Sequence, residues 1–117
     1  MPDLTRTTFD DAHTVAEHAG GSARIEIADL DGVTVTRATM QPGWRWSEHA
    51  APQAGTGSCP KEHVGYMVAG RLGVRLDDGR ELELAAGEAF RIPPGHDAWV
   101  IGEEAVVHVD FAVGASR

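Results

Sequence analysis

The stretch from residue 87 to residue 99, GEAFRIPPGHDAW, decides the predicted fold. Its apolar run ends at a proline pair, Pro93 and Pro94. Because proline cannot donate a hydrogen bond to a sheet, a strand must end there or lie at an edge. Gly95 permits a positive φ and therefore a sharp turn, directly before His96. The stretch predicts a strand, a tight turn and a returning segment that carries a histidine.

Alternation of apolar and polar residues marks most of the remaining chain as strand. Asp31-Gly32 is a strong hairpin signal, and Asp77-Asp78-Gly79 gives a second one. The predicted strands are Ala23–Leu30, Val33–Met40, Trp44–His49, His63–Ala69, Arg71–Leu76, Arg80–Leu84, Phe90–Ile92, Trp99–Ile101 and Ala105–Val113, with a loop over Ala50–Pro60. Short strands at such regular spacing favour a β-sandwich or barrel. We divide the chain into an N-terminal extension, residues 1–22, and one β-barrel domain, residues 23–117.

Composition limits the partners and the location of the protein. A length of 117 residues fits one domain, and the net charge of −8 argues against a nucleic acid or an anionic membrane as partner. Since the sequence has no signal-peptide core and no apolar run of membrane-spanning length, we expect a cytoplasmic protein. The single cysteine, Cys59, excludes an internal disulfide framework. Exposed edge strands and three tryptophans lead us to expect a homodimer.

Glycines, histidines and prolines also recur at fixed spacings. Five residues separate Gly43 from His49, and five separate Gly87 from Pro93-Pro94-Gly95. Six residues separate His63 from Gly70. These spacings resemble the two motifs of the cupin superfamily. The resemblance covers about residues 40–112 and implies an all-β fold, the double-stranded β-helix or jelly-roll barrel.

The sequence departs from the cupin pattern at three expected ligand positions. Ala51 stands where the second histidine of the first motif is expected, and His63 stands where its glutamate is expected. Ala98 replaces the last histidine of the second motif. His96 lies two residues before Ala98, so both share one face of a strand, and His96 is expected to reach roughly the place of the missing ligand.

The predicted metal ligands are His49, His63 and His96, with Cys59 as either a fourth ligand or a free thiol. Converging imidazoles suit a divalent transition metal, and Zn, Fe, Ni and Cu all remain open. Three protein ligands with a vacant position are typical of a catalytic rather than a structural site. Cys59 and His63 also form a thiol–base pair, but no sequence signal supplies a third group to orient the base.

Arg45, Met67 and Trp99 are the predicted lining of a substrate pocket, with Arg45 the cation that would meet an anionic substrate. Asp97 either orients an imidazole or caps the turn. His108 and Asp110 share a face of the last strand, and we interpret them as structural residues.

The resemblance implies a metal-dependent enzyme that acts on a small organic molecule inside the barrel. The first hypothesis is a metal-dependent oxygenase or dioxygenase. The alternatives are a metal-assisted isomerase, lyase or cyclase, and a non-catalytic cupin that binds or senses a small ligand. The fold itself does not choose among them.

Overall fold

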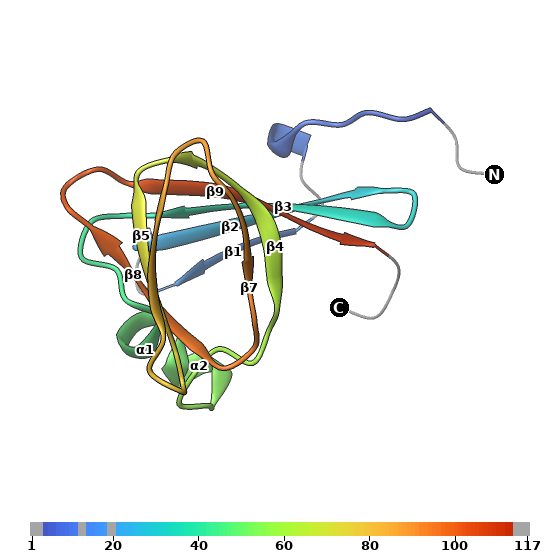
Figure 1. Cartoon of the computed structure of the whole chain (residues 1–117). Helices are drawn as coiled ribbons and strands as arrows, with labels where there is room; N and C mark the ends of the chain where they lie inside the picture. The colour runs from blue at the N-terminus through green and yellow to red at the C-terminus, as the bar shows by residue number, and fades with distance from the viewer. Residues whose placement is uncertain (1–3, 12–13, 19–20, 114–117) are drawn as a thin grey trace.

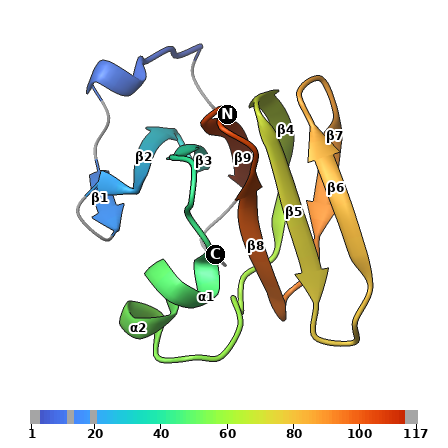
Figure 2. The ribbon, with the colours of Figure 1, turned by 90° about the vertical axis from the view of Figure 1, so that its left-hand side faces the viewer.

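Two antiparallel sheets face each other in the computed structural model, which describes residues 4–11, 14–18 and 21–113 (Figures 1 and 2). The larger sheet has the order β1 (Thr14–His18), β2 (Ala23–Leu30), β3 (Val33–Met40), β9 (Val106–Val113), β4 (His63–Ala69), β7 (Ala89–Ile92). The smaller sheet has the order β6 (Glu81–Ala85), β5 (Arg71–Leu76), β8 (His96–Ile101). This arrangement confirms the predicted jelly-roll barrel.

Alternating burial explains why these segments form strands. On β8, His96, Ala98 and Val100 are buried, whereas the residues between them are partly exposed. One face of each sheet therefore supplies the core between the sheets. The most completely buried large side chains are Met67, Leu72 and Val106.

The predicted strand Trp44–His49 is wrong, because Trp46–His49 forms the short helix α1. A second short helix, α2 (Ala51–Ala54), follows within the predicted loop. The two buried tryptophans produced the misleading alternation. Trp44 belongs to the turn after β3, where its carbonyl accepts a hydrogen bond from the Val100 N–H, and Trp46 is the buried first residue of α1. Figure 2 shows both helices below β1, β2 and β3, at the level of the lower end of β8.

The turn at Gly95 is present, with φ of +81°, and places His96 at the start of β8. That strand begins three residues earlier than the predicted Trp99–Ile101. The short strand β1 lies within the predicted N-terminal extension, and it pairs with β2. Within the described residues, no helix is long and apolar enough to cross a membrane.

Candidate metal site

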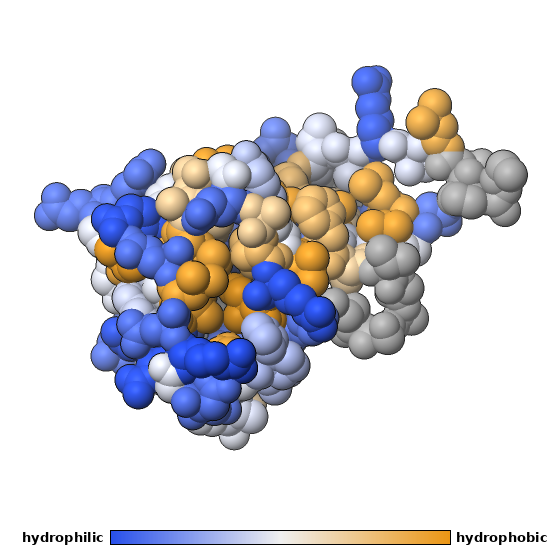
Figure 3. All heavy atoms as spheres, in the orientation of Figure 1, coloured by the Kyte–Doolittle hydropathy of each residue, from blue (hydrophilic) through white to orange (hydrophobic). Residues whose placement is uncertain are grey.

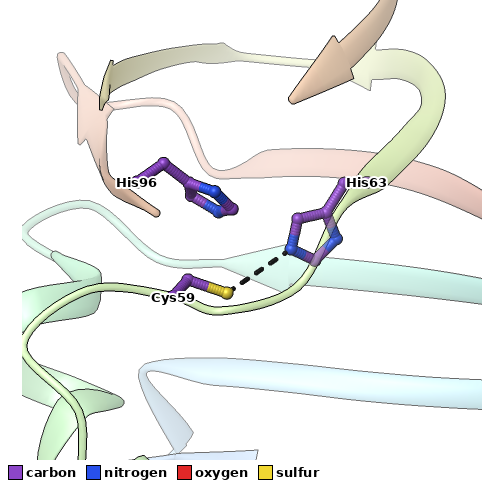
Figure 4. Close-up of side chains that lie close together, drawn as sticks. All are labelled: Cys59, His63 and His96. Atoms are coloured by element: carbon purple, nitrogen blue, oxygen red, sulfur yellow. Dashed lines mark hydrogen bonds between the residues drawn. The ribbon is translucent and has the colours of Figure 1, made fainter. Parts of the chain in front are cut away.

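Three potential metal ligands, Cys59, His63 and His96, meet at one end of the barrel (Figure 4). Their ligand atoms all lie within 4.8 Å of one another. His63 begins β4 and His96 begins β8, so the two sheets each contribute one imidazole. Cys59 precedes β4 and pairs through its backbone with His96, because its N–H donates to the His96 carbonyl at 2.8 Å.

The spacing and chemistry of these donors fit a transition metal. The distance from Cys59 Sγ to His63 Nε2 is 3.7 Å. Tetrahedral zinc with ordinary bond lengths to sulfur and nitrogen would separate the two atoms by about 3.6 Å. Thiolate and imidazole together suit zinc and copper better than hard cations such as Mg²⁺. The group therefore matches a borderline or soft divalent ion.

Both histidines use Nδ1 elsewhere and so leave Nε2 for the centre of the group. Nδ1 of His96 donates to the Pro93 carbonyl at 2.8 Å. Nδ1 of His63 lies 2.8 Å from Asp110 Oδ2. Histidine ligands in metal sites are held in this way, with the second ring nitrogen bonded to an oxygen acceptor that fixes the tautomer.

Asp110 also contacts a third histidine, His108, whose Nδ1 lies 2.7 Å from Asp110 Oδ1. Both residues are on the inward face of β9, and both are buried. The interpretation of His108 and Asp110 as separate structural residues missed this connection to His63. Their shared strand face was visible in the sequence, but the pairing of β4 with β9 that brings them to His63 was not.

These hydrogen bonds shift the pKa values of both Cys59 and His63. Burial by itself raises the pKa of the Cys59 thiol, but hydrogen bonds from His63, His96 and the Lys61 N–H outweigh it and bring the pKa to about 6. Burial by itself lowers the pKa of His63, but hydrogen bonds with Asp110 and Cys59 raise it to about 9. The metal-free group thus pairs a thiolate with an imidazolium, and metal binding would displace the His63 proton.

Asp110 remains ionised next to these groups. Burial by itself raises the pKa of its carboxyl, but hydrogen bonds with His108 and His63 hold the pKa well below the usual range. Its negative charge therefore compensates charge on the imidazoles.

His49, one of the three histidines predicted as ligands, does not join the group. It ends α1, where its Nδ1 lies 3.0 Å from the backbone N of Arg45. A strand would have pointed His49 into the barrel, whereas the helix turns its ring back to its own first turn.

The three predicted pocket residues do not line one pocket, because Arg45 and Trp99 contact each other on the outer side of β8 and Met67 lies in the core. Trp99 lies on the face of β8 opposite His96, and the Arg45 guanidinium covers its ring at 4.6 Å. Arg45 also pairs with Asp97 at 3.2 Å, so Asp97 orients no imidazole. Met67 shares the inward face of β4 with His63 and is fully buried in the core.

An open groove of about 420 Å³ reaches residues that adjoin two of the three donors. Its lining comes from β5, β6, β7 and the turns beside them: Val74, Leu76, Arg80, Glu81, Leu82, Leu84, Ala89, Phe90, Arg91, Ile92 and Pro93. Ile92 pairs with His63, and the Pro93 carbonyl holds His96, so the groove reaches the immediate neighbours of both ligands. Figure 3 shows hydrophobic atoms gathered in the middle of this view, with hydrophilic residues around them.

Comparison with known structures identifies the fold of this chain. No protein-family model and no curated protein matches the sequence. A structure of unknown function from Rhizobium leguminosarum bv. viciae is 18% identical with a TM-score of 0.66, over 97% of this chain and 99% of that one. A cupin-like protein from Thermotoga maritima is 17% identical with a TM-score of 0.54, over 78% of this chain and 68% of that one.

An oxalate decarboxylase is 20% identical with a TM-score of 0.57. The match covers 82% of this chain but 27% of the decarboxylase. Identities this low establish the fold and leave the reaction open. The two facing antiparallel sheets and the cupin-like neighbours together show that this chain has a cupin-like fold.

Proposed function

We propose that Cys59, His63 and His96 bind a divalent transition metal, with Zn²⁺ the best match, and leave a coordination position for a small organic molecule. The observation that carries the proposal is the orientation of the two imidazoles. Each is anchored at Nδ1 by an oxygen atom, and each leaves Nε2 beside the thiol. An arrangement in which both rings are anchored at Nδ1 and turn Nε2 toward the third donor is typical of metal sites.

The donor set favours Lewis-acid chemistry. Non-haem iron oxygenases typically use two histidines and one carboxylate. Here the nearby carboxylate of Asp110 is occupied by the ring N–H groups of His63 and His108. A thiolate with two imidazoles is closer to catalytic zinc sites, so we place an isomerase, lyase or cyclase ahead of the oxygenase predicted from the sequence. A bound Zn²⁺ would polarise a carbonyl oxygen or activate a water molecule.

The residues around the site indicate a small, largely apolar substrate. Cys59 and His96 are 6% and 2% exposed, whereas a quarter of the His63 side chain is accessible. Approach is therefore from the His63 side, next to Ile92 and the apolar groove. The groove is walled mainly by apolar side chains, with Arg80, Glu81 and Arg91 as its charged members, and such a lining is typical of small-molecule sites. This observation also supports the second candidate, a cupin that binds a small ligand without reacting with it.

Metal content tests the proposal directly. Protein purified without chelator and dialysed against Zn²⁺ is expected to hold about one equivalent by elemental analysis. His63→Gln and Cys59→Ser should lose it, and the matched control His49→Gln should keep it. With Co²⁺, the wild type should show a thiolate-to-cobalt charge-transfer band that is missing in Cys59→Ser.

The outcomes separate the candidates. Negligible metal in the wild type would contradict the metal site and leave the ligand-binding module. A coordination sphere filled by four protein ligands would identify a structural site rather than an enzyme. Equal metal loss in His49→Gln and His63→Gln would show that the wrong histidines have been assigned.

The protein is further proposed to be a cytoplasmic homodimer. Its one thiol suits a reducing compartment. The outer face of β4 exposes Val64, Tyr66 and Val68 to 41%, 47% and 51%, an apolar strip that a second copy would cover. Light scattering at micromolar concentration should give a dimer. Val68→Glu should shift it toward monomer, whereas Leu82→Glu, at an exposed position on β6, should not.

A further inference from the structure

The carboxylate of Asp110 lies between two imidazoles in the interior of the barrel. Its Oδ2 contacts Nδ1 of His63 at 2.8 Å, and its Oδ1 contacts Nδ1 of His108 at 2.7 Å. An ionised carboxylate only accepts hydrogen bonds, so both rings donate from Nδ1. The side chains of Asp110 and His108 are 12% and 10% exposed, so water competes little for these bonds.

The sheet is built to make room for this arrangement. Gly65 of β4 pairs with Asp110 of β9 on one side and with Phe90 of β7 on the other. A Cβ at Gly65 would lie 2.9 Å from Asp110 Oδ1 and 2.1 Å from the Val109 carbonyl oxygen. The absence of a side chain at position 65 thus leaves room for the Asp110 carboxylate on this face of the sheet.

His108 is held in turn by the aromatic ring of Phe90. The two rings meet edge to face, with centroids 5.6 Å apart. Edge-to-face contact fixes the plane of the imidazole as well as its position. His108 is therefore oriented to donate to Asp110, just as Asp110 is oriented to accept from His63.

The two histidine ligands are supported unequally. His96 donates to a neutral backbone carbonyl, whereas His63 donates to a carboxylate. Hydrogen bonds to a charged acceptor are stronger, and a carboxylate partner makes the imidazole a better metal donor. His63 should be the stronger of the two imidazole donors, and its strength should depend on residues that never touch the ion.

We propose that Asp110 and His108 are positioning residues that set the metal affinity of the Cys59–His63–His96 site through His63. This inference rests on the proposed function. Asp110 fixes the ligating tautomer of His63 and strengthens it as a donor. His108 keeps the Asp110 carboxylate aimed at His63.

The test measures Zn²⁺ and Co²⁺ dissociation constants by competition with a chelator of known affinity. Asp110→Asn keeps the shape and removes the charge, and it is expected to weaken binding by about 10- to 100-fold. His108→Leu removes the hydrogen-bond donor to Asp110 and should weaken metal binding several-fold. His108→Asn places an amide N–H where Nδ1 was, and it should recover most of the wild-type affinity.

Glu26→Gln is the matched control for Asp110→Asn. It neutralises another buried, paired carboxylate of the same sheet, on β2, away from the three donors. A loss of affinity in Asp110→Asn that Glu26→Gln does not share would support a role at the site rather than in folding. The nitrogen chemical shifts of His63 in the metal-free protein, recorded above its pKa of about 9 where the ring is neutral, give a second readout, because Asp110→Asn should reduce the fraction of the Nδ1–H tautomer.

Each outcome decides one question. If the wild type binds metal and both Asp110→Asn and His108→Leu bind it equally well, the positioning role is wrong and the metal site stands. If the wild type binds no metal, the proposed function fails and this inference fails with it. If Asp110→Asn does not fold, the comparison of His108→Leu with His108→Asn still decides, since only a positioning role predicts rescue by the amide.

Discussion

His49 and His63 both stand at expected ligand positions of one sequence motif, but the structure places them differently. His63 begins a strand, and the paired backbone of β4 with β7 and β9 determines where its ring points. His49 ends a four-residue helix, and its ring contacts the backbone of Arg45. The local backbone, strand for His63 and helix for His49, therefore decides which of the two rings joins the three-donor group. His63 and His96, which each lie on a paired strand, come together with Cys59. His49, which lies on a helix, does not join them.

The largest expected effect tests how tightly the strand that begins at His63 is packed. Gly65→Ala should destabilise the protein by about 3 kcal/mol, because its Cβ would overlap the Val109 carbonyl oxygen. Gly57→Ala, in the segment after α2, should change the free energy of unfolding little, since nothing lies within 4 Å of the added atom. Urea denaturation of both variants measures the difference. Equal stabilities would remove the contrast between the two regions.

Metal should stabilise the protein through His63 and not through His49. At a free Zn²⁺ concentration of one hundred times the dissociation constant, the free energy of unfolding should rise by about 2.7 kcal/mol. The rise should be retained in His49→Gln and absent in His63→Gln. Thermal unfolding with and without Zn²⁺ provides the measurement, and an undiminished rise in His63→Gln would count against the assignment.

Arg45 should matter for the attachment of the helical segment and not for metal. Its guanidinium lies over Trp99 and pairs with Asp97, so it joins the start of α1 to the outer face of β8. Arg45→Ala should cost about 1 kcal/mol of stability, as expected for a partly exposed cation–π contact and ion pair. Its Zn²⁺ affinity should equal that of the wild type. A drop in affinity would return Arg45 to the binding site.

The smallest expected effect concerns Glu26, a buried carboxylate that lies away from the three donors. The hydrogen bond from Arg37 lowers the pKa of Glu26 despite its burial. A lowered pKa in the folded state gives stability above the unfolded value of about 4.3, and this stability is lost as the pH falls through the folded value. Glu26→Gln should therefore lose less stability than the wild type between about pH 5 and pH 3. The expected difference is under about 1 kcal/mol, because Arg37 is partly exposed. Urea denaturation at a series of pH values measures it.

Most of the fold was predictable because it follows local rules. Alternation and turn residues located β2, β3, β4 and β5 at their observed bounds. The same rule failed at Trp44–His49, where two tryptophans are buried for different reasons, one in a turn and one in a helix. Alternation reports burial, and burial at every second residue does not require a strand.

The site was predictable only where it depended on single residues. His63, His96 and Cys59 were identified from their spacing, and the structure brings them together. Asp110 and His108 lie more than forty residues after His63, and their role depends on the pairing of β4 with β9. Such pairing is a property of the whole sheet, so no local sequence pattern contains it.

The backbone pairing of Cys59 with His96 has a consequence for how quickly the protein can take up an ion. Main-chain hydrogen bonds hold these two donors in register before any ligand arrives. Little chain entropy remains to be lost on binding, in contrast to small zinc domains that fold around their metal. Loading should therefore bury little additional apolar surface and change the heat capacity only slightly. The rate of uptake should follow the loss of water from the ion and the loss of the proton from His63, rather than any folding step.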